Sequence, residues 1–454
     1  MVEATGHPSH RLLAGSDPRA HREHGGSFDD AVVDADSPSY GERDSIGRVP
    51  VRIRTVRDLG EFRAAVGCIG HYFGWEPTEE DGESFARVLP FERLHAAVDD
   101  GAIVGGAGVF PFELTVPGGT VPCAGVTVVG VLPSHRRRGL LRRLMEAQLR
   151  DVSDRGEPLA ALWASEETIY GRFGYGLASL CLNVKTEQRA GGLRSGLPPK
   201  DGRTRLVSHE EALRAFPRLY DRLRGRSVGF LSRSHAWWEV KTLDDHPERR
   251  RGAGPLQRVL LELDGRPAGY ALYRVASEGT GDDWRKTLRV REAFGVDERA
   301  TREIWRYLLS VDWIEAVEAY MLPLDHPLRL LVARVNLLRA RVWDGLWVRL
   351  VDVGAALSAR GYAADGRVTF DVHSDPQFPD NGGTWTVADG VARRSSRRPD
   401  VRLDVQALGV AYLGGFSFAE LAHAGAAEEA SRGGLARADS LFRTDAAPWC
   451  PENF

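Results

Sequence analysis

The stretch VGVLPSHRRRGLLRRLM, which runs from Val129 to Met145, joins an apolar segment, a basic loop and a leucine-rich segment. Residues 126–131 are almost wholly apolar, which predicts a strand at the centre of a sheet. After Gly139, apolar side chains recur at helical spacing. Between these two elements lie three consecutive arginines, 136–138. The stretch therefore predicts a strand–loop–helix unit with positive charge gathered at the helix N-terminus.

A loop of this kind favours an anion, most naturally a phosphate. The first amides of a helix have no intrahelical acceptor, and the helix dipole adds about half a positive charge there. The arginines supply further charge, and Gly139 lets a ligand approach the backbone without a Cβ atom in the way. Most arginine runs are solvated turns, but the central strand and the glycine-started helix favour a ligand site. The GxxxxGK[ST] spacing of a Walker loop is absent.

The composition narrows the class of protein. A chain of 454 residues with 43% apolar content suggests several domains with buried cores. A formal charge of -3 argues against nucleic acid as the main partner. The four cysteines are widely spaced without a CxxC pair, which predicts no disulfide framework and no zinc site and is typical of a reducing cytoplasm. No apolar run is long enough to predict a membrane span.

The order of predicted elements divides the chain into four parts. Residues 1–48 are rich in Gly, Ser, Asp and His, and we expect them to form a disordered leader. Residues 49–190 begin with an alternating strand and contain a hairpin at Asp100-Gly101 and the strand–loop–helix unit. Residues 191–343 repeat this order of elements in part, without an RRRG loop, and residues 344–454 have a third composition.

Several motifs resemble those of one enzyme family. The loop resembles the acetyl-CoA pyrophosphate loop, Arg/Gln-x-x-Gly-x-Gly/Ala, of the GNAT superfamily of N-acetyltransferases, with Arg136, Gly139 and Leu141 at the marked positions. Leu141 departs from the usual Gly or Ala. With ALWASEETIYGRFGYG (161–176), DGLWVRLVDVGAALSARGY (344–362) and a terminal Phe, the chain resembles the Eis (enhanced intracellular survival) family of actinobacterial acetyltransferases. The matches run from about residue 50 to the last residue.

The resemblance implies an α/β (α+β) fold with three domains. Two tandem GNAT-like domains, 49–190 and 191–343, would be followed by a sterol-carrier-protein-like α+β domain, 344–454, that delivers the C-terminal carboxylate. The resemblance implies acetyl-CoA as the cosubstrate and no metal. Only the first domain has the cofactor loop, so we expect acetyl-CoA to bind there. The resemblance also implies a homohexamer. We expect it in the cytoplasm, with neither nucleic acid nor a membrane span.

By motif position, three segments are expected to contact acetyl-CoA. The strand end would offer backbone groups to the pantetheine arm and the thioester carbonyl, and the loop and helix start would surround the pyrophosphate. Two residues beyond the LAALW strand match further contact positions. The expected cofactor-binding residues are Val129, Gly130, Val131, Arg136, Arg137, Arg138, Gly139, Leu140, Leu141, Arg142, Ser165 and Glu166.

The resemblance also implies two catalytic groups, Tyr170 as general acid and the α-carboxylate of Phe454 as general base. Acetyl transfer requires a neutral amine, and it expels a thiolate that leaves more readily when a phenol of pKa about 10 protonates it. A carboxylate of pKa about 3.5 is a feeble base, so burial or a water chain must help it. The alternatives are a packing role for Tyr170 and a frayed end at Phe454. Trp449 and its flanking prolines favour a stiffened, docked tail.

Two tryptophans are candidates for the acceptor pocket. Trp163 stands two residues before Ser165, where the family usually has His, and Trp75 lies in HYFGWEP. Trp75 is as readily a hydrophobic plug. The resemblance implies transfer of acetyl to primary amines of small polyamine-like molecules such as aminoglycosides, by direct attack on the thioester. The alternatives are a protein lysine acetyltransferase and a non-catalytic lipid- or acetyl-CoA-binding protein, the latter motivated by the third domain.

Overall fold

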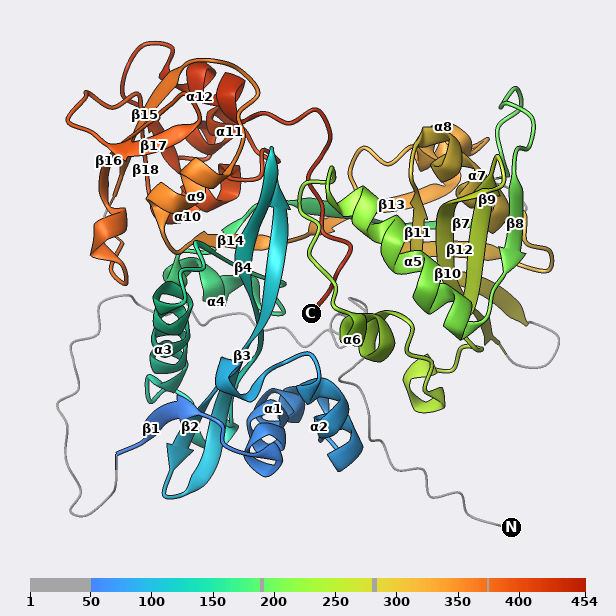
Figure 1. Ribbon diagram of the computed structural model, residues 1–454, viewed down its shortest axis with the longest axis horizontal. Coiled ribbons are helices and arrows are strands. Elements are labelled where there is room, and N and C mark those ends of the chain that lie inside the picture. Colours follow the sequence, from blue (N-terminus) through green and yellow to red (C-terminus); the bar gives the residue numbers. More distant parts are fainter. Residues whose placement is uncertain (1–49, 188–191, 280–283, 374) are drawn as a thin grey trace.

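The computed structural model describes residues 50–187, 192–279, 284–373 and 375–454, which build three sheets (Figure 1). The expected leader, 1–48, lies outside the described residues. Each sheet defines a domain, and we name the three domains in the order of their sheets. The strand orders are β1-β2-β3-β4-β5-β14-β6, then β13-β7-β12-β11-β10-β9-β8, then β17-β16-β15-β18-β19.

The first domain contains the strand–loop–helix unit that the sequence predicts. Its strands are β1 (Arg52–Thr55), β2 (Leu94–Asp99), β3 (Ala102–Val116), β4 (Gly119–Val131), β5 (Leu159–Leu162), β6 (Gly176–Leu177) and β14 (Trp347–Leu350). Its helices are α1 (Leu59–Phe73), α2 (Glu79–Ala86), α3 (Leu140–Asp154) and α4 (Glu167–Tyr170). Asp100 and Gly101 have φ of 48° and 81°, so the β2–β3 connection is the tight hairpin that Asp-Gly favours. Helix α3 buries its apolar stripe, Leu144 to Val152, against the sheet.

The second domain has a hairpin of the same kind at Asp264-Gly265, where φ is 51° and 73°. Its strands are β7 (Leu180–Glu187), β8 (Arg203–Leu206), β9 (Gln257–Leu263), β10 (Arg266–Glu278), β11 (Arg285–Gly295), β12 (Ala316–Leu322) and β13 (Leu338–Asp344). Its helices are α5 (His209–Arg224), α6 (His235–Trp237), α7 (Glu298–Leu308) and α8 (Leu328–Leu331). Helix α5 begins at Ser208, whose side chain accepts from the Glu211 amide.

The third domain is a smaller sheet covered by short helices. Its strands are β15 (Arg367–Val372), β16 (Gly383–Ala388), β17 (Val391–Arg394), β18 (Val401–Leu403) and β19 (Ala427–Glu429). Its helices are α9 (Val353–Ala359), α10 (Val405–Ala411), α11 (Phe418–His423) and α12 (Gly434–Phe442). Phe370 stacks on Phe418 at its centre, and the ring of Phe442 meets both edge to face. In Figure 1, α10 lies next to β14, and its contacts join the third domain to the first sheet.

Two strands do not follow the expected domain boundaries at 190 and 343. Strand β7 lies between β12 and β13 of the second sheet, and β14 lies between β5 and β6 of the first. The chain changes sheets where Gly345 donates its amide to the carbonyl of Ser179 at 2.9 Å. Strand β14 is buried and covers β5, which would otherwise be an open edge. Composition alone does not reveal that β14 returns to the first sheet, because this short strand comes directly after the second sheet in the chain.

The last segment of the chain, residues 443–454, leaves the third domain and ends between the other two (Figure 1). We call it the tail. Cys450 in the tail and the three other cysteines are buried thiols without a disulfide. Within the described ranges, no helix combines the length and the apolarity that a membrane crossing needs.

Candidate active site

Strands β4 and β5 part halfway along β4. Residues 123–125 pair in parallel with 159–161, and beyond Gly125 no described strand continues the pairing on that side. On its other side β4 stays paired with β3 up to Val131, with a bulge opposite Ala107. Val128 has φ of 47° in this bulge, which is rare for a β-branched residue and costs energy. From 126 to 131 the edge of β4 that faces away from β3 therefore has no described strand beside it, which leaves room for a ligand.

The basic loop ends in a helix start that presents bare amides. Arg143 makes the first bond of α3 by donating to the Gly139 carbonyl at 3.1 Å, so the three preceding amides point out of the helix end. Gly139 has φ of 72°, and a Cβ atom built on it would meet nothing within 4 Å. Arg137 also has a positive φ, of 60°. This open, amide-lined turn has the shape and polarity that a diphosphate requires.

The arginines of the loop are not equivalent. Arg138 pairs at 3.0 Å with Asp99, which is buried and also contacts His135 at 3.1 Å. Arg142 pairs along α3 with Glu146 at 3.3 Å. By contrast, the remaining two loop arginines, 136 and 137, are exposed and form no ion pair with the described part of the chain. The free positive charge at the helix start therefore comes from these two, while Arg138 is engaged by the β2–β3 hairpin.

The apolar residues of the stretch anchor the loop. Leu140 and Leu144 are buried, and Leu141 is half-buried beside Val129. The buried Gln148 of α3 donates its side-chain amide to the Gly108 carbonyl at 2.9 Å, next to the bulge. Helix α3 thus fixes both the loop and the bulged part of the sheet, while Gly130 in β4 packs directly on the backbone of α1.

Tyr170 lies at the end of α4, shortly after β5. Its side chain is buried with Val126 of β4, and its ring meets that of Tyr175 edge to face at 6.0 Å. Burial raises the pKa of Tyr170 to about 12, so the phenol keeps its proton at neutral pH. Ser165 and Glu166 are exposed just before α4, and Glu166 accepts from the Thr168 hydroxyl at 2.7 Å as the cap of that helix.

The ring of Phe454 packs on the opposite face of the same strands. It meets Phe110 and Phe112 edge to face, with centroids 6.3 Å and 5.3 Å away, and a Cβ on Gly125 would lie 3.3 Å from it. Phe110 pairs across the strands with Gly125, and the neighbouring pair, 109 with 126, faces the cluster of Tyr170. Successive residues of a strand point to opposite faces. The two predicted catalytic residues therefore flank β4 from two sides, at the level where it leaves β5.

The tail reaches this position along the second domain. The Ala447 amide donates to the Asp325 carboxylate at 2.9 Å, and the Trp449 amide donates to the Val228 carbonyl at 3.0 Å. The Trp449 ring meets Phe230 edge to face at 5.0 Å. The expectation of a docked tail agrees with these contacts.

The two candidate tryptophans differ in their surroundings. Trp163 is half-buried and neighbours Cys450 of the tail, whose pKa burial raises to about 12. The Trp75 side chain is buried, and a Cβ on Gly70 of α1 would come within 2.5 Å of its ring. Trp75 therefore has the plug-like packing that the sequence left as an alternative, whereas Trp163 adjoins the docked tail.

Beside the tail lies a buried cluster of charges that the sequence motifs do not predict. Arg233 contacts Glu452 at 2.5 Å and Glu292 at 2.6 Å, and its side chain is 0% exposed. Nearby, Lys241 lies 5.3 to 5.9 Å from the ring centroids of Phe85, Phe110 and Trp237. The one sign of Lys241 in the sequence is the rarity of lysine, because only four of the 60 Lys and Arg residues are lysines.

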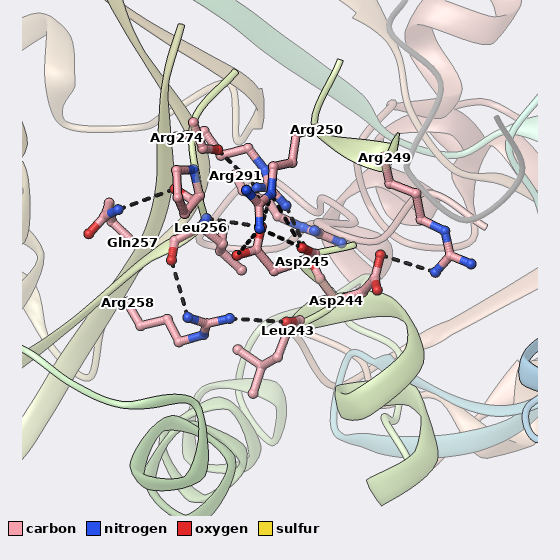
Figure 2. Close-up of polar contacts among 12 residues, drawn as sticks. Leu243, Asp244, Asp245, Arg249, Arg250, Leu256, Gln257, Arg258, Arg274 and Arg291 are labelled. Carbon is pink, nitrogen blue, oxygen red and sulfur yellow. Dashed lines mark hydrogen bonds and ion pairs between the residues drawn. The ribbon is translucent and has the colours of Figure 1, made fainter. Parts of the chain in front are cut away.

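A second polar cluster fixes the segment that follows Lys241 (Figure 2). Asp245 accepts from the Leu256 amide and from two arginines, 250 and 274. Arg249 pairs with Asp244 at 3.2 Å and reaches Asp81 of α2 at 2.8 Å. Arg291 donates to the carbonyl of Lys241 itself. The cluster thus holds the lysine's backbone and ties the second domain to the first. The described residues contain no group of three His, Cys, Asp or Glu side chains suited to a metal ion.

Comparisons with known proteins agree with this architecture. Residues 52–178 and 229–350 each match the model of an acetyltransferase (GNAT) domain, and residues 353–451 match that of a sterol carrier protein domain. These matches confirm the fold that the sequence predicts, two GNAT-like domains followed by a sterol-carrier-like domain.

Full-length relatives are similar over nearly their whole length. The chain is 40% identical over 409 residues to an uncharacterized N-acetyltransferase of Streptomyces coelicolor, covering 87% of this chain and 97% of the relative. It is 34% identical over 406 residues to the N-acetyltransferase Eis of Mycobacterium tuberculosis, covering 85% and 94%. The crystal structure of Eis1 from Mycobacterium abscessus matches with a TM-score of 0.77 at 32% identity, covering 89% of this chain and 100% of that chain.

Proposed function

Because the chain belongs to the Eis family of GNAT-superfamily N-acetyltransferases, we propose that it acetylates primary amines of small polyamine-like molecules such as aminoglycosides. The protein is an N-acetyltransferase, which excludes the non-catalytic alternative, and acetyl-CoA is the donor that its superfamily uses. The acceptor class, the site residues and the mechanism belong to the proposal.

In this mechanism the acetyl-CoA diphosphate binds at the start of α3. The bare amides after Gly139 and the free charges of Arg136 and Arg137 receive it, and the backbone of 129–131 faces the pantetheine arm. Arg138 would act indirectly, because Asp99 holds it. The thioester would then lie where β4 and β5 part, within reach of both faces of the strand.

The acceptor nitrogen attacks the thioester carbonyl directly. A C–N bond forms, the C–S bond breaks, the amine proton passes to the α-carboxylate of Phe454 and the thiolate takes the Tyr170 proton. The position of these two residues on opposite faces of β4, at the level of Gly125, is the observation that carries the proposal. The raised pKa of the phenol keeps it protonated at neutral pH, as a proton donor must be.

The test is to extend the C-terminus. A single added glycine moves the carboxylate while leaving the Phe454 side chain in place, so kcat for a reactive amine should fall about a hundredfold. The assay follows thiol release from acetyl-CoA with a panel of aminoglycosides and simple diamines. Undiminished turnover in the extended protein would remove the carboxylate from the mechanism, and a panel without turnover would remove the substrate class. Incubation with lysine-rich proteins and mass spectrometry checks the protein-acetylating alternative.

The assembly and the location form part of the same proposal. We propose a homohexamer, and light scattering should give about six times the mass of the chain. A monomer would contradict it. We also propose a cytoplasmic site of action, which is supported by four buried, unpaired thiols.

A further inference from the structure

Arg233 stands where three parts of the molecule meet. The residues just before it pair with β3, because Ser232 and Thr115 take part in hydrogen bonds of 2.9 Å and 2.8 Å between the segments 229–232 and 113–115. Strand β3 also carries the two phenylalanines that contact the terminal ring. The position of Arg233 is therefore fixed relative to the surface on which Phe454 lies.

The guanidinium joins the tail to the second sheet. Its Nε donates to Glu452 at 2.5 Å, and its two terminal nitrogens donate to Glu292 of β11 at 2.6 Å and 3.1 Å. The Tyr270 hydroxyl donates to the same Glu292 at 2.8 Å. The fork geometry of arginine satisfies two carboxylates at once, which a lysine ammonium does not achieve.

The surroundings hold the guanidinium in one orientation. It lies 3.9 Å from the ring centroid of Tyr220 and 4.9 Å from that of Trp238, and it is wholly buried. Removing it would leave two carboxylates buried together without a cation, which is costly for both. Glu452 is the member of this group that can leave, since it belongs to the tail.

We infer that Arg233 is a positioning residue that sets the location of the C-terminal carboxylate by holding Glu452, two residues before the chain end. Two residues span at most about 7 Å, so fixing Glu452 confines the carboxylate to a small region beside β4. The second domain, which lacks the cofactor loop, thereby contributes to the reaction of the first. This inference rests on the proposed function.

The experiment measures docking of the tail separately from catalysis. Carboxypeptidase A releases Phe454 only when the tail leaves its site, so the release rate reports docking in the full-length protein. Arg233→Met should speed the release by about tenfold or more and lower kcat by a similar factor, with KM for acetyl-CoA nearly unchanged. Glu452→Gln should act in the same direction but less, because Arg233 keeps its pair with Glu292. Arg233→Lys should restore part of both.

Two control variants separate the effect of losing the Arg233–Glu452 contact from a general loss of stability. Glu318→Gln alters another buried carboxylate of the second sheet, paired with Lys185 at 2.7 Å, and should leave both readouts at wild-type values. Tyr170→Phe should lower kcat without changing the release rate. Wild-type release and kcat in both Arg233→Met and Glu452→Gln would overturn the inference. Faster release of Phe454 with unchanged kcat would show that Arg233 holds the tail but that the C-terminal carboxylate is not the general base. If Arg233→Met does not fold, Glu452→Gln decides alone.

Discussion

Lys241 is a buried lysine in an arginine-rich chain, and its charge depends on pH in a way that an arginine's does not. Arginine remains charged when buried, whereas lysine can release its proton. Burial lowers the pKa of Lys241 to about 8, while Glu452 and Asp244 oppose the change and Arg291 and Arg249 reinforce it. Three aromatic rings surround the amino group. The pKa of this lysine therefore lies well below that of an exposed lysine.

Replacing Lys241 by Met should stabilise the protein at neutral pH. Because the folded pKa lies below the unfolded value of 10.5, the folded protein binds fewer protons between pH 8 and 10.5, so wild-type stability rises with pH across that window. Below pH 8 the amino group is protonated in both states, and the folded protein bears the full cost of burying its charge. The variant should be more stable by about 1–3 kcal/mol at pH 7, and this advantage should shrink by pH 10.

Urea denaturation at pH 7, 8.5 and 9.5, followed by tryptophan fluorescence, measures this difference. The four buried thiols titrate in both proteins, so they cancel in the comparison. A gain that does not change with pH would show that the amino group keeps its proton throughout.

For the buried ion pair of Arg349 and Asp375, we expect a substitution to destabilise the protein. Arg349 of β14 is 0% exposed and pairs with Asp375, which also accepts from the Asn381 amide at 2.9 Å. Asp375→Ala leaves the guanidinium buried without its carboxylate, and we expect a loss of about 3–5 kcal/mol in unfolding free energy. Asp375→Asn keeps the shape and should lose less. Denaturation midpoints of the two variants check the order, and equal midpoints would contradict it.

The separate elements of the first domain follow from local sequence. The Asp-Gly hairpin, the apolar β4 and the stripe of α3 are each specified by a few neighbouring residues. The bulge at Val128 is not, because valine favours a regular strand and its local sequence gives no sign of the positive φ of 47°. The return of β14 to the first sheet also cannot be predicted from the sequence, since it depends on which sheet edge the strand meets. Of the candidate active site, the basic loop can be predicted from the sequence, whereas the buried ion pairs of Arg233 and Arg249 cannot.

Helix α3 offers a matched pair of glycines that tests the phosphate site. Gly139 before it and Gly156 after it both have φ of 72°, and neither would give a Cβ contact within 4 Å. Alanine at either position adds similar strain, about 1–2 kcal/mol. Only Gly139→Ala should also raise KM for acetyl-CoA, by about tenfold, because its Cβ faces the proposed diphosphate. Equal KM values in both variants would contradict a binding role for this turn.

The three domains are joined too closely to unfold one at a time. Strand β14 follows the strands of the second sheet in the chain yet completes the first sheet. Arg249 bridges the second domain to Asp81 of the first, and the tail carries Glu452 of the third into a wholly buried ion pair with Arg233 of the second. Unfolding any one domain therefore breaks a sheet or a buried ion pair in another.

We expect a single calorimetric transition for the full chain because of these shared elements. Asp375→Ala, whose lesion lies between the first and third domains, should lower the temperature of the whole transition without splitting it. Arg233→Met should act likewise, since the tail couples all three domains. Two or three resolved transitions in the unmodified protein would show that the shared strands and the tail transmit little free energy. The terminal carboxylate would then owe its position to local contacts with β3 and β4 alone.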